Sequence, residues 1–170
     1  SSPTLLCIFP LPLWFLYSFV ALLPAESHGA SSKENSGKKC KETPERLELD
    51  ELDDARFFYF YNSSTNACEH EFVRIDDDRK YDSFYECVTE CGTGQGAPRC
   101  VQNQTSDCSD GDDCDEFFTY DVQLKRCIPI QTTYANYIAN ASHNIFLREQ
   151  YCKNDCSGFT EDDVCGTKNC

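Results

Sequence analysis

Cysteine content constrains this chain more than any other feature of its sequence. Thirteen of the 170 residues are cysteine, a frequency that is typical of secreted, disulfide-bonded proteins and unlike that of cytosolic enzymes. Cys7 stands alone in an apolar N-terminal stretch, and the other 12 cysteines lie between Cys40 and Cys170. An even number of cysteines in an extracellular chain predicts a disulfide framework, here with up to six bridges.

The first 27 residues have the pattern of a secretory signal peptide. The stretch Leu5–Leu23 is almost entirely apolar and uncharged, and Ala25-Glu26-Ser27 follows with small residues at its first and third places. A membrane anchor is the alternative, since the stretch is about long enough to span a bilayer, but the cleavage-like end favours a signal peptide. We therefore expect a secreted, extracellular protein with no membrane contact once residues 1–27 are removed.

Three asparagines stand in N-glycosylation sequons, which agrees with secretion. They are Asn62-Ser63-Ser64, Asn103-Gln104-Thr105 and Asn140-Ala141-Ser142. Each sequon predicts an exposed asparagine that can carry a glycan, so we expect a glycoprotein.

The spacing of the cysteines indicates an internal repeat. Cys40, Cys68, Cys87 and Cys91 are separated by 28, 19 and 4 positions, and Cys100, Cys127, Cys152 and Cys156 by 27, 25 and 4. Two similar units are therefore expected, at residues 40–91 and 100–156.

The remaining segments are assigned from their composition. Residues 28–39 are rich in Ser, Lys and Gly and are expected to form a flexible N-terminal arm. Residues 92–99 contain Gly and Pro and are expected to be a linker, and residues 157–170 form a tail with two further cysteines.

Each unit has the same predicted order of elements, a β-hairpin followed by a short helix. Residues 56–61 are aromatic, a polar turn follows, and residues 68–75 resume with apolar positions, which predicts a hairpin whose core is the aromatic cluster Phe57–Tyr61. Residues 116–120 and 126–130 form the counterpart, where Pro129 indicates an edge strand or a strand end. Two cysteines four residues apart end each unit on one face of a helix. The sequence therefore predicts a small disulfide-rich α+β protein.

The first unit resembles the Kunitz domain, the fold of the pancreatic trypsin inhibitor. Tyr59-Phe60-Tyr61-Asn62 lies shortly before Cys68, where this family has an aromatic run followed by Asn, and Phe72 matches a later family aromatic. Tyr81-Asp82-Ser83 matches the family's Phe-x-Ser, and Cys91-Gly92 its final Cys-Gly.

The second unit resembles the family less closely, through Phe118, Tyr120 and Asp121 before Cys127 and through Phe146 before Cys152. The resemblance implies two Kunitz-like domains, each a twisted β-hairpin with a short C-terminal helix. The disulfide pairs that it implies are Cys40–Cys91, Cys68–Cys87, Cys100–Cys156 and Cys127–Cys152.

The third family bridge, which ties the inhibitory loop to the hairpin, is missing. Its first cysteine would fall near Leu52 and its second near Asp76, and in the second unit near Gly111 and Ala135. The cysteines left over are Cys108, Cys114, Cys165 and Cys170. We expect them to pair among themselves in two bridges that tie the tail to the second loop.

The residue that enters the protease specificity pocket in this family corresponds to Asp53 in the first unit and to Asp112 in the second. An aspartate is repelled by the acidic pocket of a trypsin-like enzyme, and a loop without its bridge loses preorganisation. The resemblance therefore argues against inhibition through the standard loop formed around Leu52 and Gly111.

Charge narrows the choice of partner. The formal net charge is −14, which argues against binding to nucleic acid or to an anionic membrane. Five carboxylates lie within residues 48–54, namely Glu48, Asp50, Glu51, Asp53 and Asp54. They form either a solvated loop or a docking surface for a basic exosite on another protein.

An enzyme is not expected. His70 and His143 have no nucleophile near them in a recognised motif, and the register of residues 107–113 does not fit a calcium loop. No cofactor and no metal are therefore predicted.

The chain is similar in layout to the degenerate two-domain Kunitz proteins of tick saliva, the bilaris-like group. This resemblance implies a monomeric, anti-haemostatic serine protease inhibitor that acts on a clotting enzyme of the host by non-covalent occlusion, with the arm or a loop over the active site. The alternative is a module that inhibits no protease and binds a host channel, platelet receptor or other extracellular protein.

Overall fold

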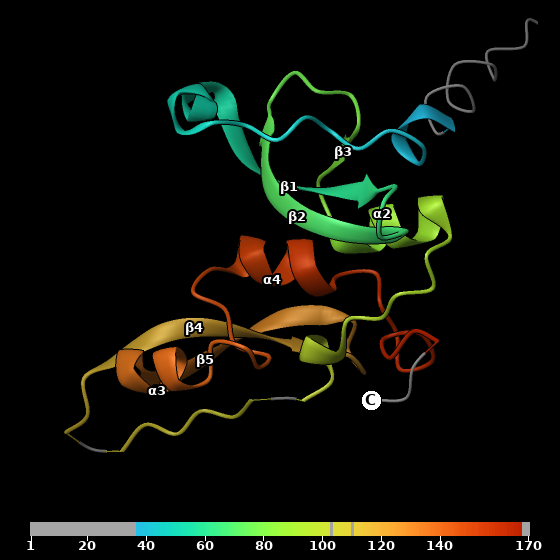
Figure 1. Ribbon diagram of the computed structural model, residues 1–170. Coiled ribbons are helices and arrows are strands. Elements are labelled where there is room, and N and C mark those ends of the chain that lie inside the picture. The colour runs from blue at the N-terminus through green and yellow to red at the C-terminus, as the bar shows by residue number, and fades with distance from the viewer. Residues whose placement is uncertain (1–36, 103, 110, 168–170) are drawn as a thin grey trace, which may run out of the picture.

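The computed structural model describes residues 37–102, 104–109 and 111–167, and of Leu49 only the backbone. These residues form two small antiparallel sheets with short helices beside them (Figure 1). The predicted disulfide-rich α+β class is confirmed. The predicted signal peptide, residues 28–36 of the predicted arm, Asn103 and Cys170 lie outside the described residues. No helix in the described ranges has both the length and the apolar character needed to cross a membrane.

Residues 40–91, called the first half below, contain a three-stranded sheet of order β2-β1-β3. Its elements are η1 (Leu49–Asp54), β1 (Ala55–Asn62), β2 (Ala67–Arg74), β3 (Lys80–Tyr81) and α2 (Phe84–Cys91). Strands β1 and β2 pair over their full length in one hairpin. Asn66 at the turn has a φ of 54°, a left-handed conformation that asparagine adopts more readily than most residues. The predicted first hairpin is confirmed.

Helix α2 starts and ends with standard capping residues. Ser83 lies just before the helix, and its Oγ accepts a hydrogen bond from the Glu86 amide at 3.3 Å. Gly92 ends the helix with a φ of 61° and donates its amide to the Val88 carbonyl. The buried face carries Cys87 and Val88. Cys87 on this face bonds Cys68 of β2, whereas Cys91 bonds Cys40 in the segment before the sheet.

Residues 100–156, the second half, repeat the hairpin and the helix. The elements here are η2 (Pro98–Cys100), β4 (Cys114–Asp121), β5 (Arg126–Thr133), α3 (Tyr134–Ala139) and α4 (Glu149–Cys156). Phe118 and Phe146 exchange two backbone hydrogen bonds of 2.8 Å on the other side of β4. The amide and carbonyl of Phe118 thus face away from β5, so Pro129 opposite it needs no amide hydrogen. The predicted second hairpin is confirmed, with Pro129 inside an edge strand.

Five disulfides link the described cysteines, and four of them join pairs that the family resemblance implies. They are Cys40–Cys91, Cys68–Cys87, Cys100–Cys156, Cys127–Cys152 and Cys108–Cys114. The expected bridge from the tail to the second loop is wrong. Cys108 and Cys114 are only 6 positions apart at the two ends of that loop, with a Cα–Cα distance of 6.3 Å, so they bond to each other. Cys165 in the tail is disulfide-bonded as well.

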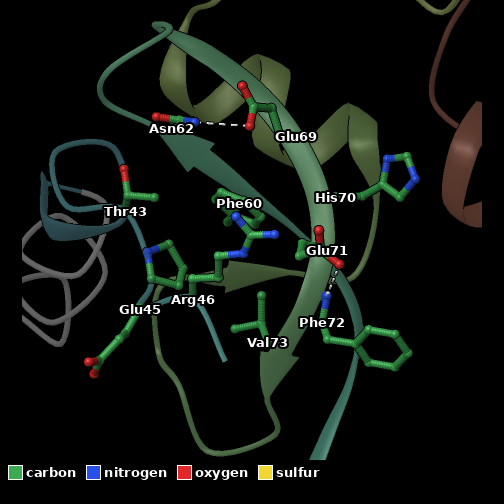
Figure 2. Close-up of a pocket in the computed structure, with 11 residues that line it drawn as sticks. Thr43, Glu45, Arg46, Phe60, Asn62, Glu69, His70, Glu71, Phe72 and Val73 are labelled. Carbon is green, nitrogen blue, oxygen red and sulfur yellow. Dashed lines mark hydrogen bonds between the residues drawn. The ribbon is translucent and has the colours of Figure 1, made fainter. Parts of the chain in front are cut away.

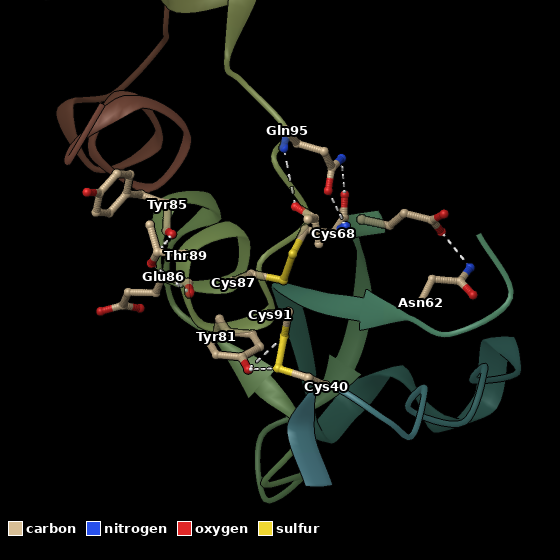
Figure 3. The surroundings of a disulfide bond; sticks show 12 residues. Cys40, Asn62, Cys68, Tyr81, Tyr85, Glu86, Cys87, Thr89, Cys91 and Gln95 are labelled. Atoms are coloured by element: carbon tan, nitrogen blue, oxygen red, sulfur yellow. Dashed lines mark hydrogen bonds between the residues drawn. A yellow bond between two sulfur atoms is a disulfide. The ribbon is translucent and has the colours of Figure 1, made fainter. Parts of the chain in front are cut away.

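Buried polar groups surround the disulfides of the first half (Figure 3). The Tyr81 hydroxyl lies 3.5 Å from the Cys40 sulfur and 3.3 Å from the Cys91 sulfur. Burial, with a smaller contribution from Glu90, raises the pKa of Tyr81, so this hydroxyl stays protonated. The side-chain amide of Gln95 accepts from the Cys68 amide and donates to the Cys68 carbonyl at 3.1 Å. The segment after α2 is therefore bonded to the hairpin beside the second disulfide.

The linker and the tail pair with each other. Ala97 donates its amide to the Val164 carbonyl at 2.6 Å, and Thr167 donates to the Gly94 carbonyl at 2.9 Å. Gly96 lies so close to the tail that a Cβ atom there would be 2.2 Å from the Gly166 nitrogen. Residues 94–97 and 164–167 therefore form a packed backbone contact, although the Gly and Pro content of the linker suggested a simple connector.

Phe159 of the tail packs the two halves together. Its side chain is 1% exposed and contacts Phe84 and Tyr85 of α2, with ring centroids 5.8 and 5.1 Å away. Its carbonyl accepts a 2.7 Å hydrogen bond from the buried Tyr120 hydroxyl of β4. Helix α4 lies between the two hairpins and contacts α2 (Figure 1). The tail thus joins α2 of the first half to β4 of the second.

We predict that Phe159→Ala lowers the free energy of unfolding by about 3–5 kcal/mol, because it leaves a cavity between the halves. The measurement is guanidinium denaturation followed by near-ultraviolet circular dichroism. Leu124→Ala is the control, since Leu124 is 56% exposed and its truncation should change stability by less than about 0.5 kcal/mol. Similar values for both variants would show that the tail does not hold the halves together.

Candidate binding surface

The five clustered carboxylates lie on one exposed 3-10 turn, η1. We call Glu48, Asp50, Glu51, Asp53 and Asp54 the acidic turn; each of them is exposed. The Glu48 amide donates to the Glu51 carboxylate at 3.0 Å, and the Glu51 amide donates to the Glu48 carbonyl at 3.0 Å. These two bonds begin the turn and leave the other carboxylates facing water.

Leu52 and Asp53, which the sequence resemblance aligns with an inhibitory loop, lie inside this turn. The Leu52 carbonyl accepts the amide of Ala55, and Leu52 is half-buried while Asp53 is exposed. Because the turn satisfies part of its own backbone, it presents carboxylates and offers little free backbone for pairing with an extended partner strand.

Non-covalent contacts hold the acidic turn near the positions, around Leu52 and Asp76, where the sequence resemblance would place a bridge. The Ile75 amide donates to the Asp54 carbonyl at 2.9 Å. The Arg74 guanidinium lies 4.0 Å from the Glu51 carboxylate and 3.5 Å from that of Asp76. These contacts span the positions near Leu52 and Asp76. Arg74 offsets part of the negative charge, and the turn remains strongly acidic.

The loop between β2 and β3 is stabilised by a bidentate ion pair. Arg79 donates from Nε to one oxygen of Asp77 at 2.9 Å and from Nη2 to the other at 2.7 Å, and its amide also bonds Asp77. The hydrogen bonds from Arg79 lower the pKa of Asp77 below its ordinary value of 3.8, against an opposing effect of burial. The ionised carboxylate therefore stabilises the loop that follows the Arg74 contacts.

Gly111 and Asp112, which the sequence resemblance aligns with the loop of the second half, are exposed and lie within the loop closed by Cys108–Cys114. Gly111 has a φ of 99°, and the Asp112 carboxylate accepts the Ser109 amide at 2.8 Å. This loop and η1 lie at opposite ends of the molecule (Figure 1). The structure therefore does not bring the two loop equivalents together into one site.

The C-terminal end of the predicted flexible arm is docked on the first half. Lys38 pairs with Asp78 at 3.4 Å, and the Lys39 ammonium lies 4.6 Å above the ring centroid of Tyr81. Residues 37–39 are helical. An ion pair and a cation–π contact therefore connect the last residues of the predicted arm to the first half.

A pocket of about 300 Å³ lies where residues 43–46 cross the hairpin (Figure 2). Arg46 points toward Phe60 at its centre. Glu69 at its rim accepts hydrogen bonds from Thr65 at 2.6 Å and Asn62 at 2.9 Å, and these bonds lower the pKa of its carboxyl. The sequon residue Asn62 is therefore engaged with Glu69.

The two described sequon asparagines are half-buried, and the expectation of exposed positions is wrong for both. Asn62 ends β1 and bonds Glu69, whereas Asn140 follows α3 and donates to the Asn136 carbonyl at 3.0 Å. Each asparagine stabilises a turn with its side chain, which explains its partial burial.

The aromatic run of β1 is not the uniform hairpin core that the sequence suggested. Within Phe57–Tyr61 only Phe60 is buried, while Phe57 is 58% exposed. Side chains alternate along a strand, so alternate members of such a run must face outward. Alternation alone divides the run between two faces and does not identify which members are buried.

Comparison with models of known protein families found no match, and a search of curated proteins found none. The molecule is therefore classed by its own features, as a small disulfide-rich α+β protein that presents an exposed acidic turn.

We predict that Asp77→Asn lowers the free energy of unfolding by about 1–3 kcal/mol at pH 7, because it removes hydrogen bonds to a charged group. The folded-state pKa of Asp77 lies below its unfolded value. Its stabilising effect is thus complete above the unfolded pKa and is lost as the pH falls through the folded pKa. The difference between wild type and variant should therefore be largest at pH 7 and should shrink as the pH falls below 3.8, as measured by urea denaturation.

Asp76→Asn serves as the control for this prediction, since the Asp76 side chain is 82% exposed. It should change stability by less than about 0.5 kcal/mol at pH 7 and at pH 2. An equal loss for Asp77→Asn at pH 7 and pH 2 would contradict the role given to the ionised carboxylate.

Proposed function

We propose that the chain is a secreted, Kunitz-type inhibitor of a host serine protease that acts through the acidic turn rather than through a basic standard loop. The observation that carries this proposal is the exposed acidic turn at the position equivalent to the inhibitory loop. Five carboxylates on one short turn are suited to a basic exosite on another protein.

The assignment to a Kunitz-type fold is supported by the order of elements in each half. Each half contains a hairpin and a helix with two cysteines four residues apart. In each half, a third strand or an isolated bridge also pairs with the first strand of the hairpin. In each half one helical cysteine bonds the hairpin and the other bonds the segment before it. This repetition agrees with two degenerate domains.

Secretion is supported by the signal-like N-terminus and by the disulfides, which persist in oxidising compartments. The resemblance to tick salivary proteins places the target among the clotting enzymes. The inhibitor would occlude the enzyme without covalent chemistry, with the acidic turn on an exosite and residues 28–36 over the active site.

The alternative is a binding module that inhibits no protease. It is favoured by the compact conformation of η1, in which the Leu52 carbonyl is bonded inside the turn. A turn of this kind contacts a partner through side chains, and a channel, a platelet receptor or another basic extracellular protein would serve as well as a protease.

A panel of proteases separates these functions. The refolded chain without residues 1–27 is tested against thrombin, factor Xa, trypsin, plasmin and elastase with small chromogenic substrates, and against thrombin also with fibrinogen. Inhibition with fibrinogen alone is the result expected of exosite binding, and inhibition with both substrates is expected if the arm also covers the active site. No inhibition across the panel would favour the alternative.

Neutralising the acidic turn should slow association with the inhibited protease by about tenfold or more at low salt, since steering by charge is lost. The variant replaces its five carboxylates by amides, and stopped-flow or surface plasmon resonance gives the association rate. The matched control removes the same charge from five exposed carboxylates elsewhere, at Asp82, Glu86, Glu90, Glu161 and Asp162. Equal rates for both variants would contradict docking through the acidic turn.

Deleting residues 28–36 should abolish inhibition with a small chromogenic substrate and leave exosite binding intact, because the Lys38 and Lys39 contacts remain. Inhibition constants and thermal melting of the truncated chain provide the check. Full potency after the deletion would assign active-site occlusion to another segment.

A further inference from the structure

A groove of about 400 Å³ runs between the two halves, close to the acidic turn. We call it the interhalf groove, and the residues that line it include Phe57, Tyr59, Tyr137, Leu147, Tyr151 and Asp155. Phe57, Leu147 and Tyr151 are 58%, 41% and 52% exposed. Large apolar side chains that remain exposed around a concave surface are typical of a binding site.

The polar groups at the base of the groove are already paired. Asp155 accepts a hydrogen bond from the Tyr59 hydroxyl on one carboxylate oxygen and from Arg99 at 3.1 Å on the other. Arg99 also donates to the carbonyls of His143 and Ile145 at 2.8 and 2.9 Å. Because this ion pair is satisfied within the protein, the groove is better suited to an apolar side chain than to an ion.

The groove is also preformed. Tyr59 comes from β1 of the first half, Asp155 from α4 of the second, and Arg99 from η2 at their junction. Their hydrogen bonds cross between the halves, and Arg99 lies 4.1 Å above the Phe146 ring centroid. A groove whose walls are held by such contacts loses little entropy when it is filled.

Phe57 connects the groove with the acidic turn along the chain. Phe57 follows Asp54 by three residues along β1, a distance of at most about 10 Å between their Cα atoms. Phe57 packs on Phe72 of β2, with ring centroids 4.0 Å apart, which holds it at the rim. When the basic surface of a partner protein contacts the acidic turn, neighbouring side chains of that partner are therefore close enough to enter the apolar groove.

We propose that the interhalf groove receives one projecting aromatic or aliphatic side chain from the basic protein surface that docks on the acidic turn. This inference rests on the proposed function for the charged part of the contact and adds an apolar anchor to it. Charge brings the partner to the turn, and burial of the anchor side chain supplies specificity.

The test uses two peptides of identical charge, each with three lysines on either side of one central residue. The central residue is tryptophan in one peptide and glycine in the other. Binding to the full chain without residues 1–27 is measured by nuclear magnetic resonance titration at low salt. We expect the tryptophan peptide to bind about tenfold tighter or more, as burial of a large apolar side chain requires.

The double variant Leu147→Ser/Tyr151→Ser should abolish the tighter binding of the tryptophan peptide. It should leave the affinity for the glycine peptide unchanged, because both side chains are exposed and neither belongs to the acidic turn. Leu124→Ser is the control, since Leu124 is as exposed as Phe57 and does not line the groove. It should keep the advantage in full. Retention of the advantage in the double variant would overturn the groove as the anchor site.

The outcomes separate this inference from the proposed function. Equal, salt-dependent binding of both peptides would overturn the groove and leave docking on the acidic turn in place. Binding of neither peptide would overturn both.

Discussion

Each half of this molecule depends on two disulfides that leave the same face of one short helix. Cys87 and Cys91 lie four positions apart on α2, and Cys152 and Cys156 repeat the spacing on α4. One bond of each pair holds the hairpin and the other holds the segment before it. A unit of about 55 residues buries little apolar surface and is only marginally stable without bridges, and each bridge adds about 2–4 kcal/mol.

These two units are joined by the tail, and this arrangement positions the surface features. Phe159 is inserted against α2, and residues 94–97 bond to residues 164–167. The Tyr59–Asp155–Arg99 contacts add a polar connection between β1 and α4. Because the halves are packed against each other, the position of the acidic turn relative to the interhalf groove is fixed. One partner can therefore contact both.

Local patterns in the sequence were sufficient to predict the two hairpins, the helices α2 and α4 and the α+β class, whereas helix α3 was not predicted. The aromatic and apolar runs on either side of polar turns and the cysteine spacing are short-range signals that the structure retains. The aromatic run showed a hairpin correctly, but its composition alone gave no sign that Phe57 faces outward while Phe60 is buried.

Long-range packing was the part that the sequence did not reveal. The Cys108–Cys114 bond depends on the path of one loop, and the pairing of Gly96 with Gly166 depends on contacts between distant segments. The acidic turn was evident as a charge cluster, whereas its 3-10 conformation was not. The groove was missed because its walls come from both halves.

The most direct test of docking through the acidic turn is hydrogen exchange of the chain with and without thrombin whose active site is blocked by a small inhibitor. Blocking the active site leaves the basic exosites of the enzyme as the available partner. We expect slower exchange on binding at residues 48–57, where the acidic turn meets the rim of the groove. Unchanged exchange there, or slowing confined to the loop at residues 108–114, would contradict docking through this turn.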